Sequence, residues 1–224
     1  GLWLRPLNSF EARRLPNTED GAQPFWSPDG QSSAFFAQGR VYAIDLARGD
    51  RRELCAFSGI ARGGTWSIAG AIIFATSSPA SLVRVPSEGG KPTPISLPGA
   101  EHHRGPVSWP MFLPDGRSLL YWARTLTDEG GGIHIATVGS DAEAGRLLAS
   151  DTQAIHVAPG YLLFGRESRL YRQRFDVETK RPSGDPVPVV DALRTAPIGL
   201  GEFSASSTGL LAYRQEMDAS NHFT

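Results

Sequence analysis

The chain has 224 residues and a formal net charge of −1, with 22 lysines and arginines against 23 aspartates and glutamates. The excess of positive charge that a nucleic-acid binder places against phosphates is missing, so we expect no nucleic acid partner. Hydrophobic residues make up 40% of the chain, and its 25 glycines and 17 prolines indicate a globular fold rich in turns, which excludes a disordered or fibrous chain.

A turn motif recurs along the chain and defines a repeat. Its clearest copy is Phe25 to Gly30, whose final glycine allows the left-handed conformation that closes a hairpin. Further copies lie at 65–70 and 111–116, and weaker ones lie at 156–160 and 202–206. Successive copies are 40 to 46 residues apart, which is the length of one blade of a β-propeller.

Each copy of the turn joins two expected strands, and two more strands follow. In the first full repeat the run 33–37 is apolar, as expected of a strand buried on both faces, and the run 41–46 alternates in polarity. Pro94 and Pro188 fit only edge strands, because proline cannot donate a hydrogen bond to a ladder. The next three repeats are each expected to contain a second, a third and a fourth strand. These are expected at 71–75, 82–85 and 93–97 in the second repeat, at 119–123, 133–138 and 146–148 in the third, and at 161–164, 170–175 and 187–190 in the fourth.

The two ends of the chain carry half-repeats. Residues 2–7 and 12–15 match third and fourth strands, and residues 202–213 match first and second strands. We therefore predict an all-β fold, a β-propeller of four-stranded antiparallel blades with four full repeats and two half-repeats. Either the half-repeats complete a fifth blade, or both are cuts through a larger ring. The expected single domain spans 1–224, with half-blades at 1–20 and 192–216 and blades at 21–58, 59–98, 99–149 and 150–191.

The most conspicuous residues of the repeat are interpreted as structural. Asp29 and Asp115 are expected to form the turns, because a short carboxylate there can bond the backbone ahead of it. The aromatic residues that precede the turns are expected to pack the blades, as large aromatic residues on inner strands generally do; they are Trp26, Trp66 and Phe112. Cys55, the only cysteine, lies in an apolar stretch and is expected to be buried.

The turn sequences at 26–30 and 112–116, with the downstream run Tyr42 to Leu46, resemble the TolB-like, WD40-like propeller repeat of bacteria. Segments 2–7, 62–66, 159–164 and 186–189 look like the propeller region that follows the kinase domain in some bacterial serine/threonine kinases. The resemblance covers essentially the whole chain. It implies a ligand-binding, protein-binding or sensor module in the extracytoplasmic part of a larger bacterial protein.

The chain shows no familiar catalytic motif. A Gly-x-Ser-x-Gly elbow, a glycine-rich phosphate loop with its lysine, and the kinase motifs are all missing from the sequence. We therefore expect no enzyme activity of its own, no catalytic residue, no cofactor and no metal. No apolar run approaches the ~18 residues of a membrane span, so no membrane segment is expected in these residues. The alternative is a propeller hydrolase or lyase, or a propeller domain that accompanies a peptidase.

The densest polar cluster, at 101–104, lies in a long link between two blades. In propellers such links share one face with the loops between second and third strands, around the mouth of the central channel. Loops on a rigid scaffold are where binding residues concentrate. The predicted binding surface for a protein or a small polar ligand consists of the charged residues of these links: Arg62, Glu101, His102, His103, Arg104, Asp151 and Arg194.

Overall fold

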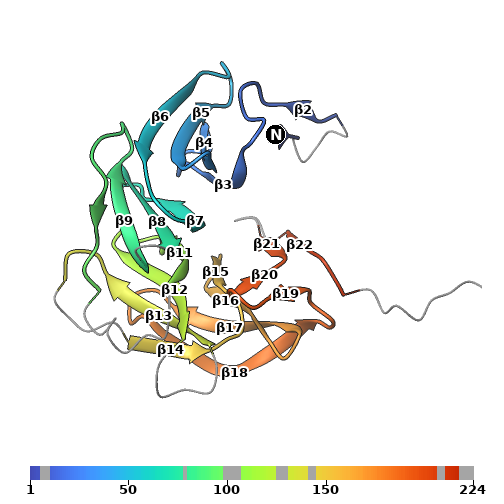
Figure 1. The fold of residues 1–224 in the computed structure, drawn as a ribbon. Helices are drawn as coiled ribbons and strands as arrows, with labels where there is room; N and C mark the ends of the chain where they lie inside the picture. The colour runs from blue at the N-terminus through green and yellow to red at the C-terminus, as the bar shows by residue number, and fades with distance from the viewer. Residues whose placement is uncertain are drawn as a thin grey trace, which may run out of the picture. The chain divides into compact units, whose positions relative to one another are not determined.

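The computed structural model describes residues 1–5, 11–77, 80–97, 107–124, 131–140, 145–205 and 210–216, whose regular structure is all β-strand. The chain divides into two compact units, Gly1–Ser96 and Leu97–Thr224, and each is described by itself. Figure 1 shows the strands of both units. Within the described residues no helix is long and apolar enough to cross a membrane.

The first unit contains a two-stranded ribbon and two four-stranded antiparallel sheets, blades 1 and 2. Strands that are neighbours along the chain are neighbours in each sheet, so every blade is a simple meander. The ribbon pairs β1 (Trp3–Leu4) with β2 (Arg13–Arg14). The strands of the blades are β3 (Ala22–Trp26), β4 (Ser32–Ala37), β5 (Arg40–Asp45) and β6 (Arg51–Ala56), then β7 (Ala61–Trp66), β8 (Ala71–Ser77), β9 (Ala80–Pro86) and β10 (Thr93–Pro94).

The second unit contains blades 3 and 4 and two short hairpins. Blade 3 is formed by β11 (Ser108–Phe112), β12 (Ser118–Arg124), β13 (Gly131–Thr137) and β14 (Gly145–Ala149). Blade 4 is formed by β15 (Ala154–Val157), β16 (Tyr161–Arg166), β17 (Arg169–Asp176) and β18 (Arg181–Val190). The hairpins are β19 (Thr195–Ala196) with β20 (Leu200–Gly201), and β21 (Phe203–Ala205) with β22 (Leu211–Tyr213).

The sheets confirm the predicted all-β fold of four-stranded antiparallel blades, with differences at its periphery. The second strand of each blade is buried along most of its length, as expected. β18 begins at Arg181 and is longer than the expected strand at 187–190, because it follows β17 across a bulge. The hairpin β19–β20 was not predicted, since two-residue strands leave no period to detect. The grouping of all repeats into one domain stays a prediction.

The turn between β3 and β4 forms as its sequence predicts. Gly30 has a φ of +68°, the left-handed conformation that glycine adopts at no steric cost. Asp29 Oδ1 accepts hydrogen bonds from the Ser27 hydroxyl (2.6 Å) and from the Gln31 N–H (3.0 Å). These two bonds hold the pKa of Asp29 below its ordinary value. Asp29 is therefore a structural residue of the turn, as interpreted from the sequence.

Hydrogen bonds at the two ends of a blade define a link rim and a turn rim. At the link rim the chain entering a blade meets the turn between second and third strands, as where the Asp151 N–H donates to Gly165 O (2.8 Å). At the turn rim the end of the third strand meets the turn between first and second strands, as where the Leu46 N–H donates to Gln31 O (3.0 Å). Equivalent turn-rim bonds join Ser87 to Gly70, Val138 to Arg117 and Phe175 to Gly160.

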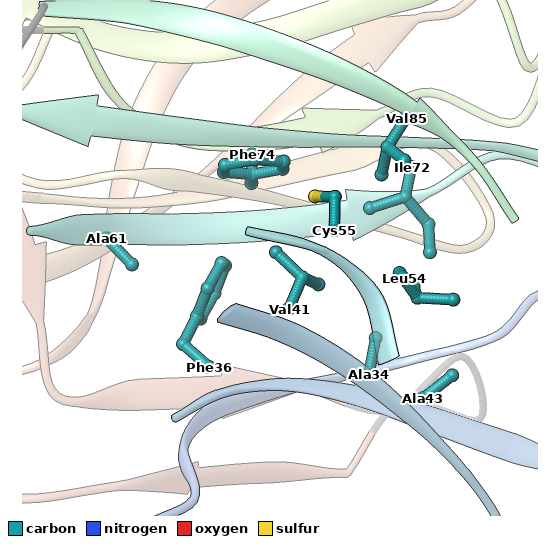
Figure 2. Packing of buried hydrophobic residues seen from close by; sticks show 10 residues of the cluster. All are labelled: Ala34, Phe36, Val41, Ala43, Leu54, Cys55, Ala61, Ile72, Phe74 and Val85. Carbon is teal, nitrogen blue, oxygen red and sulfur yellow. The ribbon is translucent and has the colours of Figure 1, made fainter. Parts of the chain in front are cut away.

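Blades 1 and 2 pack through an apolar cluster that contains the single cysteine. Phe36 and Phe74 lie within the cluster with their ring centroids 5.8 Å apart, and Phe25 and Phe57 pack beside them. Cys55 is buried, as expected, and burial raises its pKa to about 11. Figure 2 shows the buried members of the cluster: Ala34, Phe36, Val41, Ala43, Leu54, Cys55, Ala61, Ile72, Phe74 and Val85.

The expectation that Trp26 packs the blade is wrong. Its side chain is 59% exposed, whereas the neighbouring Phe25 packs against the core. Successive residues of a strand point to opposite faces, so only one of the two can face the cluster. Trp66, at the matching position of blade 2, is half-buried and does pack against the core. The sequence repeat therefore aligned two tryptophans that have different environments.

Blades 3 and 4 pack around Trp122, which is 5% exposed. Its Nε1–H donates a hydrogen bond to Ser150 O (2.9 Å). A Cβ atom built on Gly131 or on Gly199 would overlap with the Trp122 ring system, so both glycine backbones lie directly against it. Gly199 belongs to the turn between β19 and β20, and this unpredicted hairpin therefore takes part in the core of the second unit.

Candidate functional site on the link rim

Arg62 lies at the start of β7, on the link rim of the first unit. The pairing of β7 with β8 shifts register between Ala61 and Gly64, which marks a bulge at this position. Gln23 of blade 1 holds the bulge in place: its Oε1 accepts from the Gly63 N–H (2.8 Å), and its Nε2 donates to Ala61 O (3.2 Å). The bulge fixes the backbone of Arg62 through bonds from the neighbouring blade.

The Arg62 side chain is half-buried, and its Nε is buried without a hydrogen-bond partner among the described residues. Buried polar groups in folded proteins are nearly always hydrogen-bonded, because an unmade bond costs about 1 to 3 kcal/mol. A guanidinium only donates hydrogen bonds, so a partner here would have to present an acceptor such as a carboxylate or carbonyl oxygen.

In the second unit, Asp151 and Arg194 both lie beside the turn between β16 and β17. The Glu167 N–H in this turn donates to Asp151 Oδ2 (2.7 Å), so the carboxylate helps to hold the turn. On the other side the Leu193 N–H donates to Ser168 O (2.7 Å), which places the segment leading to Arg194 at the same turn. Two residues of the predicted surface, both in this unit, thus lie beside the same loop.

Arg194 is part of an exposed ion network across a short ladder. Its Nε lies 3.2 Å from Glu202 Oε1, and Arg214 Nη1 lies 3.3 Å from the other oxygen of the same carboxylate. Backbone bonds hold the three residues together, because the Glu202 N–H donates to Arg194 O and the Arg214 N–H donates to Glu202 O. One carboxylate shared by two guanidinium groups leaves a positive balance at this part of the rim.

Arg166 is a rim residue that sequence reasoning missed. It ends β16 next to the turn that Asp151 holds, and its guanidinium lies 5.2 Å from the ring centroid of Tyr171. Its Nε is buried without a hydrogen-bond partner among the described residues, as in Arg62. The signal was available in principle, because Arg166 follows the apolar run 161–164 at the point where the strand reaches the link rim.

The hairpin β19–β20 is anchored to the link rim of the second unit. Gln153 binds it with both polar atoms of its side-chain amide, since the Gly201 N–H donates to its Oε1 (2.7 Å) and its Nε2 donates to Gly201 O (2.9 Å). The Trp109 Nε1–H of blade 3 donates to Ile198 O (2.9 Å). The hairpin therefore bridges the link into blade 4 and the first strand of blade 3.

Four members of the predicted surface lie outside the described residues: Glu101, His102, His103 and Arg104. Arg62 belongs to the first unit, and Asp151 and Arg194 belong to the second. The predicted surface as a whole therefore stays a prediction. The described link rims present buried guanidinium donors and exposed ion pairs, a combination suited to recognising a partner rich in oxygen acceptors.

No family model matches the chain, and no curated protein matches it. Several solved structures are similar to it. The chain is similar to TolB from Acinetobacter baumannii with a TM-score of 0.63 and 15% identity, over 83% of this chain and 49% of that one. It is similar to regucalcin, a calcium-binding protein from Agrobacterium tumefaciens, with a TM-score of 0.61 and 16% identity, over 87% and 67%. A gluconolactonase from Xanthomonas campestris gives a TM-score of 0.62 and 11% identity, over 85% and 68%.

These likenesses establish the fold class: the chain is a β-propeller of antiparallel blades. It spans about half the length of the TolB structure. At such low identity the comparisons bear on the fold alone, and the predicted place in the kinase-associated family is not confirmed by them.

The expectation that the chain has no enzyme activity of its own is contradicted. Solved propellers similar to it are a gluconolactonase, a luciferin-regenerating enzyme and a virginiamycin B lyase, and others include an auxiliary nutrient binding protein. The expectation rested on missing sequence motifs. A fold hosts many unrelated functions, which depend on the site built on it, so missing motifs of other folds exclude no activity.

The calcium named for regucalcin raises the question of a metal site in this chain. In the part of the chain that the structure describes, no group of three or more His, Cys, Asp and Glu side chains is placed to hold a metal ion. Calcium requires six to eight oxygen ligands. The described residues therefore do not fit such an ion.

Proposed function

We propose that the chain is a ligand- or protein-binding propeller module whose binding surface is the link rim. The observation that carries this proposal is the pair of buried guanidinium nitrogens that have no partner among the described residues, Arg62 Nε and Arg166 Nε. Both lie at link rims, one in each unit. A bound carboxylate or carbonyl oxygen would accept hydrogen bonds from these nitrogens. Without such an acceptor, their missing hydrogen bonds cost stability.

The proposed surface extends to the other charged residues of the links. Arg194 and Asp151 contribute to it in the second unit, and the sequence adds Glu101, His102, His103 and Arg104. The resemblance to the TolB-like repeat and to the propeller region of bacterial serine/threonine kinases supports an extracytoplasmic module of a larger bacterial protein. Its partner would be another protein or a small polar ligand.

The test is a thermal-shift screen of small carboxylates, sugar acids and peptides with a free terminal carboxylate, followed by titration calorimetry of each hit. Arg62→Gln and Arg166→Gln keep a polar side chain but shorten it and remove the charge. We expect at least one of them to weaken binding about tenfold, which corresponds to ~1.4 kcal/mol of binding free energy. The control is Arg181→Gln, an exposed arginine at the turn-rim end of β18. Hits that bind both rim variants and the control as tightly as the parent protein would refute the proposal.

A second candidate function is a propeller hydrolase or lyase. It is favoured by the enzymes among the similar structures, of which two named gluconolactonases provide a defined first substrate. Incubation with gluconolactone and related lactones, followed by pH-stat titration of the acid released, tests it directly. Turnover above the uncatalysed rate that Arg62→Gln or Arg166→Gln abolishes would assign catalysis to the link rim. Turnover that neither variant changes would place the reacting groups elsewhere.

A further inference from the structure

A small cavity lies on the turn rim of the first unit, away from the link rim. It has a volume of about 330 Å³ and lies between the first turns of blades 1 and 2. Pro28 and Asp29 line it from one turn, and Trp66 and Ile68 line it from the other, together with smaller residues. Its described lining contains one charged side chain, Asp29, on an otherwise largely apolar wall.

Two large apolar side chains at or next to this cavity are open to solvent. Ile68 is 79% exposed, and Trp26, which follows Phe25 into the same turn, is 59% exposed. Trp26 lines a second cavity, of about 530 Å³, together with Leu4 and Asp45. Exposed large apolar residues that gather beside a polar group are typical of an interaction site on a soluble protein.

The carboxylate of Asp29 has an oxygen to offer. Only Oδ1 takes part in the turn, and Oδ2 has no partner among the described residues. The matching Asp115 of blade 3 differs, because its Oδ1 accepts from two backbone N–H groups and its Oδ2 accepts from the Ser118 hydroxyl at 2.5 Å. The pKa of Asp29 is held below its ordinary value, chiefly by the hydrogen bond from Ser27, so the side chain is ionised at neutral pH.

We propose that this cavity binds an arginine side chain of a partner polypeptide. The guanidinium would stack on the indole of Trp66 and pair with Asp29 Oδ2, while the aliphatic stem packs along Pro28 and Ile68. Arginine combines these features, since its flat cation stacks on aromatic rings and its stem is apolar. The partner residue beside this arginine would cover Trp26. This surface is distinct from the link rim, and the proposal does not depend on the proposed function.

The experiment compares two blocked peptides, alanine-arginine-alanine and the same peptide with citrulline in place of arginine. Citrulline keeps the length and planar shape of the side chain, but it carries no charge and has a carbonyl oxygen in place of one NH2 group. Binding is followed by the shift of the Trp66 indole N–H signal in two-dimensional NMR spectra of the whole chain. We expect the arginine peptide to bind at millimolar concentrations and the citrulline peptide to bind at least about fivefold more weakly.

Variants locate the binding on the protein. Asp29→Asn keeps the turn, because the asparagine carbonyl accepts the same two hydrogen bonds, and Ile68→Ser removes an exposed side chain without opening the core. Both are expected to weaken the arginine peptide about fivefold or more, whereas the matched control Asp115→Asn leaves its affinity unchanged. Thermal melts check that all three proteins remain folded.

Four results with the peptides would overturn the proposal. They are no binding of the arginine peptide at millimolar concentrations, equal binding of the citrulline peptide, an equal loss in Asp115→Asn, and tighter binding of a leucine peptide. The last would assign the cavity to an apolar partner. Dimerisation of the parent protein that Ile68→Ser abolishes would assign it to a second copy of the chain, and would overturn it as well.

Discussion

The joint between blades 1 and 2 and the joint between blades 3 and 4 arise from the same repeat but are held in different ways. In the first, Phe25 lies over Gly64, and the ring is half-buried at the edge of a phenylalanine cluster. In the second, Trp122 is buried, and one of the two glycines against it, Gly199, comes from a hairpin outside both blades. The repeat thus specifies the strands, whereas the second joint also depends on a hairpin that the repeat does not contain.

The largest expected effect is at the second joint. Gly199→Ala places a methyl group against the Cγ and Cδ2 atoms of Trp122, at the base of a buried side chain that has no room to move away. The φ of Gly199 is +75°, so alanine is strained there as well. We expect a loss of about 3 to 5 kcal/mol in the free energy of unfolding, the sum of overpacking and backbone strain.

Urea denaturation measures this loss, and Gly184→Ala is the control. Gly184 has a φ of +66° but no atom within 4 Å of an added Cβ, so this variant isolates the backbone strain. A loss for Gly199→Ala no larger than that of Gly184→Ala would show that the hairpin does not clamp the Trp122 ring.

The first joint should tolerate its glycine substitution better. In Gly64→Ala the added methyl overlaps with the far edge of the Phe25 ring, which is half-buried and can tilt toward solvent. Gly64 also has no left-handed backbone. We expect a loss of about 1 to 3 kcal/mol by urea denaturation, smaller than for Gly199→Ala. The reverse order of the two variants would contradict the difference drawn between the joints.

A substitution in a turn outside both joints tests how much backbone strain at a β-branched residue lowers the stability. In Gly30→Val the added Cβ meets no atom within 4 Å, but the φ of +68° is strained for valine. We expect a loss of about 1 to 3 kcal/mol in thermal or urea unfolding, and a smaller one for Asp29→Ala. An unchanged melting temperature for Gly30→Val would refute the assigned role of the turn.

The sequence predicted the blades because their signals are local. A turn glycine and a two-residue period act within a few positions, and β4, β8, β12 and β16 form close to where these signals place them. The environment of Trp26 was mispredicted because the repeat aligns positions in the chain, and the face that a side chain occupies also depends on the bulge earlier in β3.

The candidate site was less accessible to sequence reasoning. Asp151 and Arg194 were chosen because they lie in links, and the structure puts both next to the turn that follows β16. What distinguishes Arg62 and Arg166 is a buried nitrogen without an acceptor in the described part of the chain, and this depends on side-chain packing that no spacing encodes. The clamp of Gly199 on Trp122 joins residues 77 positions apart and leaves no pattern in the sequence.

The smallest expected effect tests the second joint through pH, since that joint contains a titratable ring. His156 of β15 lies edge-on to Phe175 with ring centroids 6.2 Å apart, and its Nε2 is buried without a hydrogen-bond partner among the described residues. Burial lowers its pKa from the ordinary value of 6.5. The folded protein therefore takes up a proton at this ring less readily than the unfolded chain does.

The sign of the pH effect follows from this difference. Just below the ordinary pKa the unfolded chain binds more protons at His156 than the folded protein, so the stability that the neutral ring allows is lost as the pH falls. His156→Phe keeps an aromatic ring at the joint but cannot be protonated. In urea denaturation at about pH 7 and about pH 5, the parent protein should lose more stability between the two values than the variant does. The other four histidines are common to both proteins, so equal losses would mean that His156 is as accessible to protons in the folded joint as in the unfolded chain.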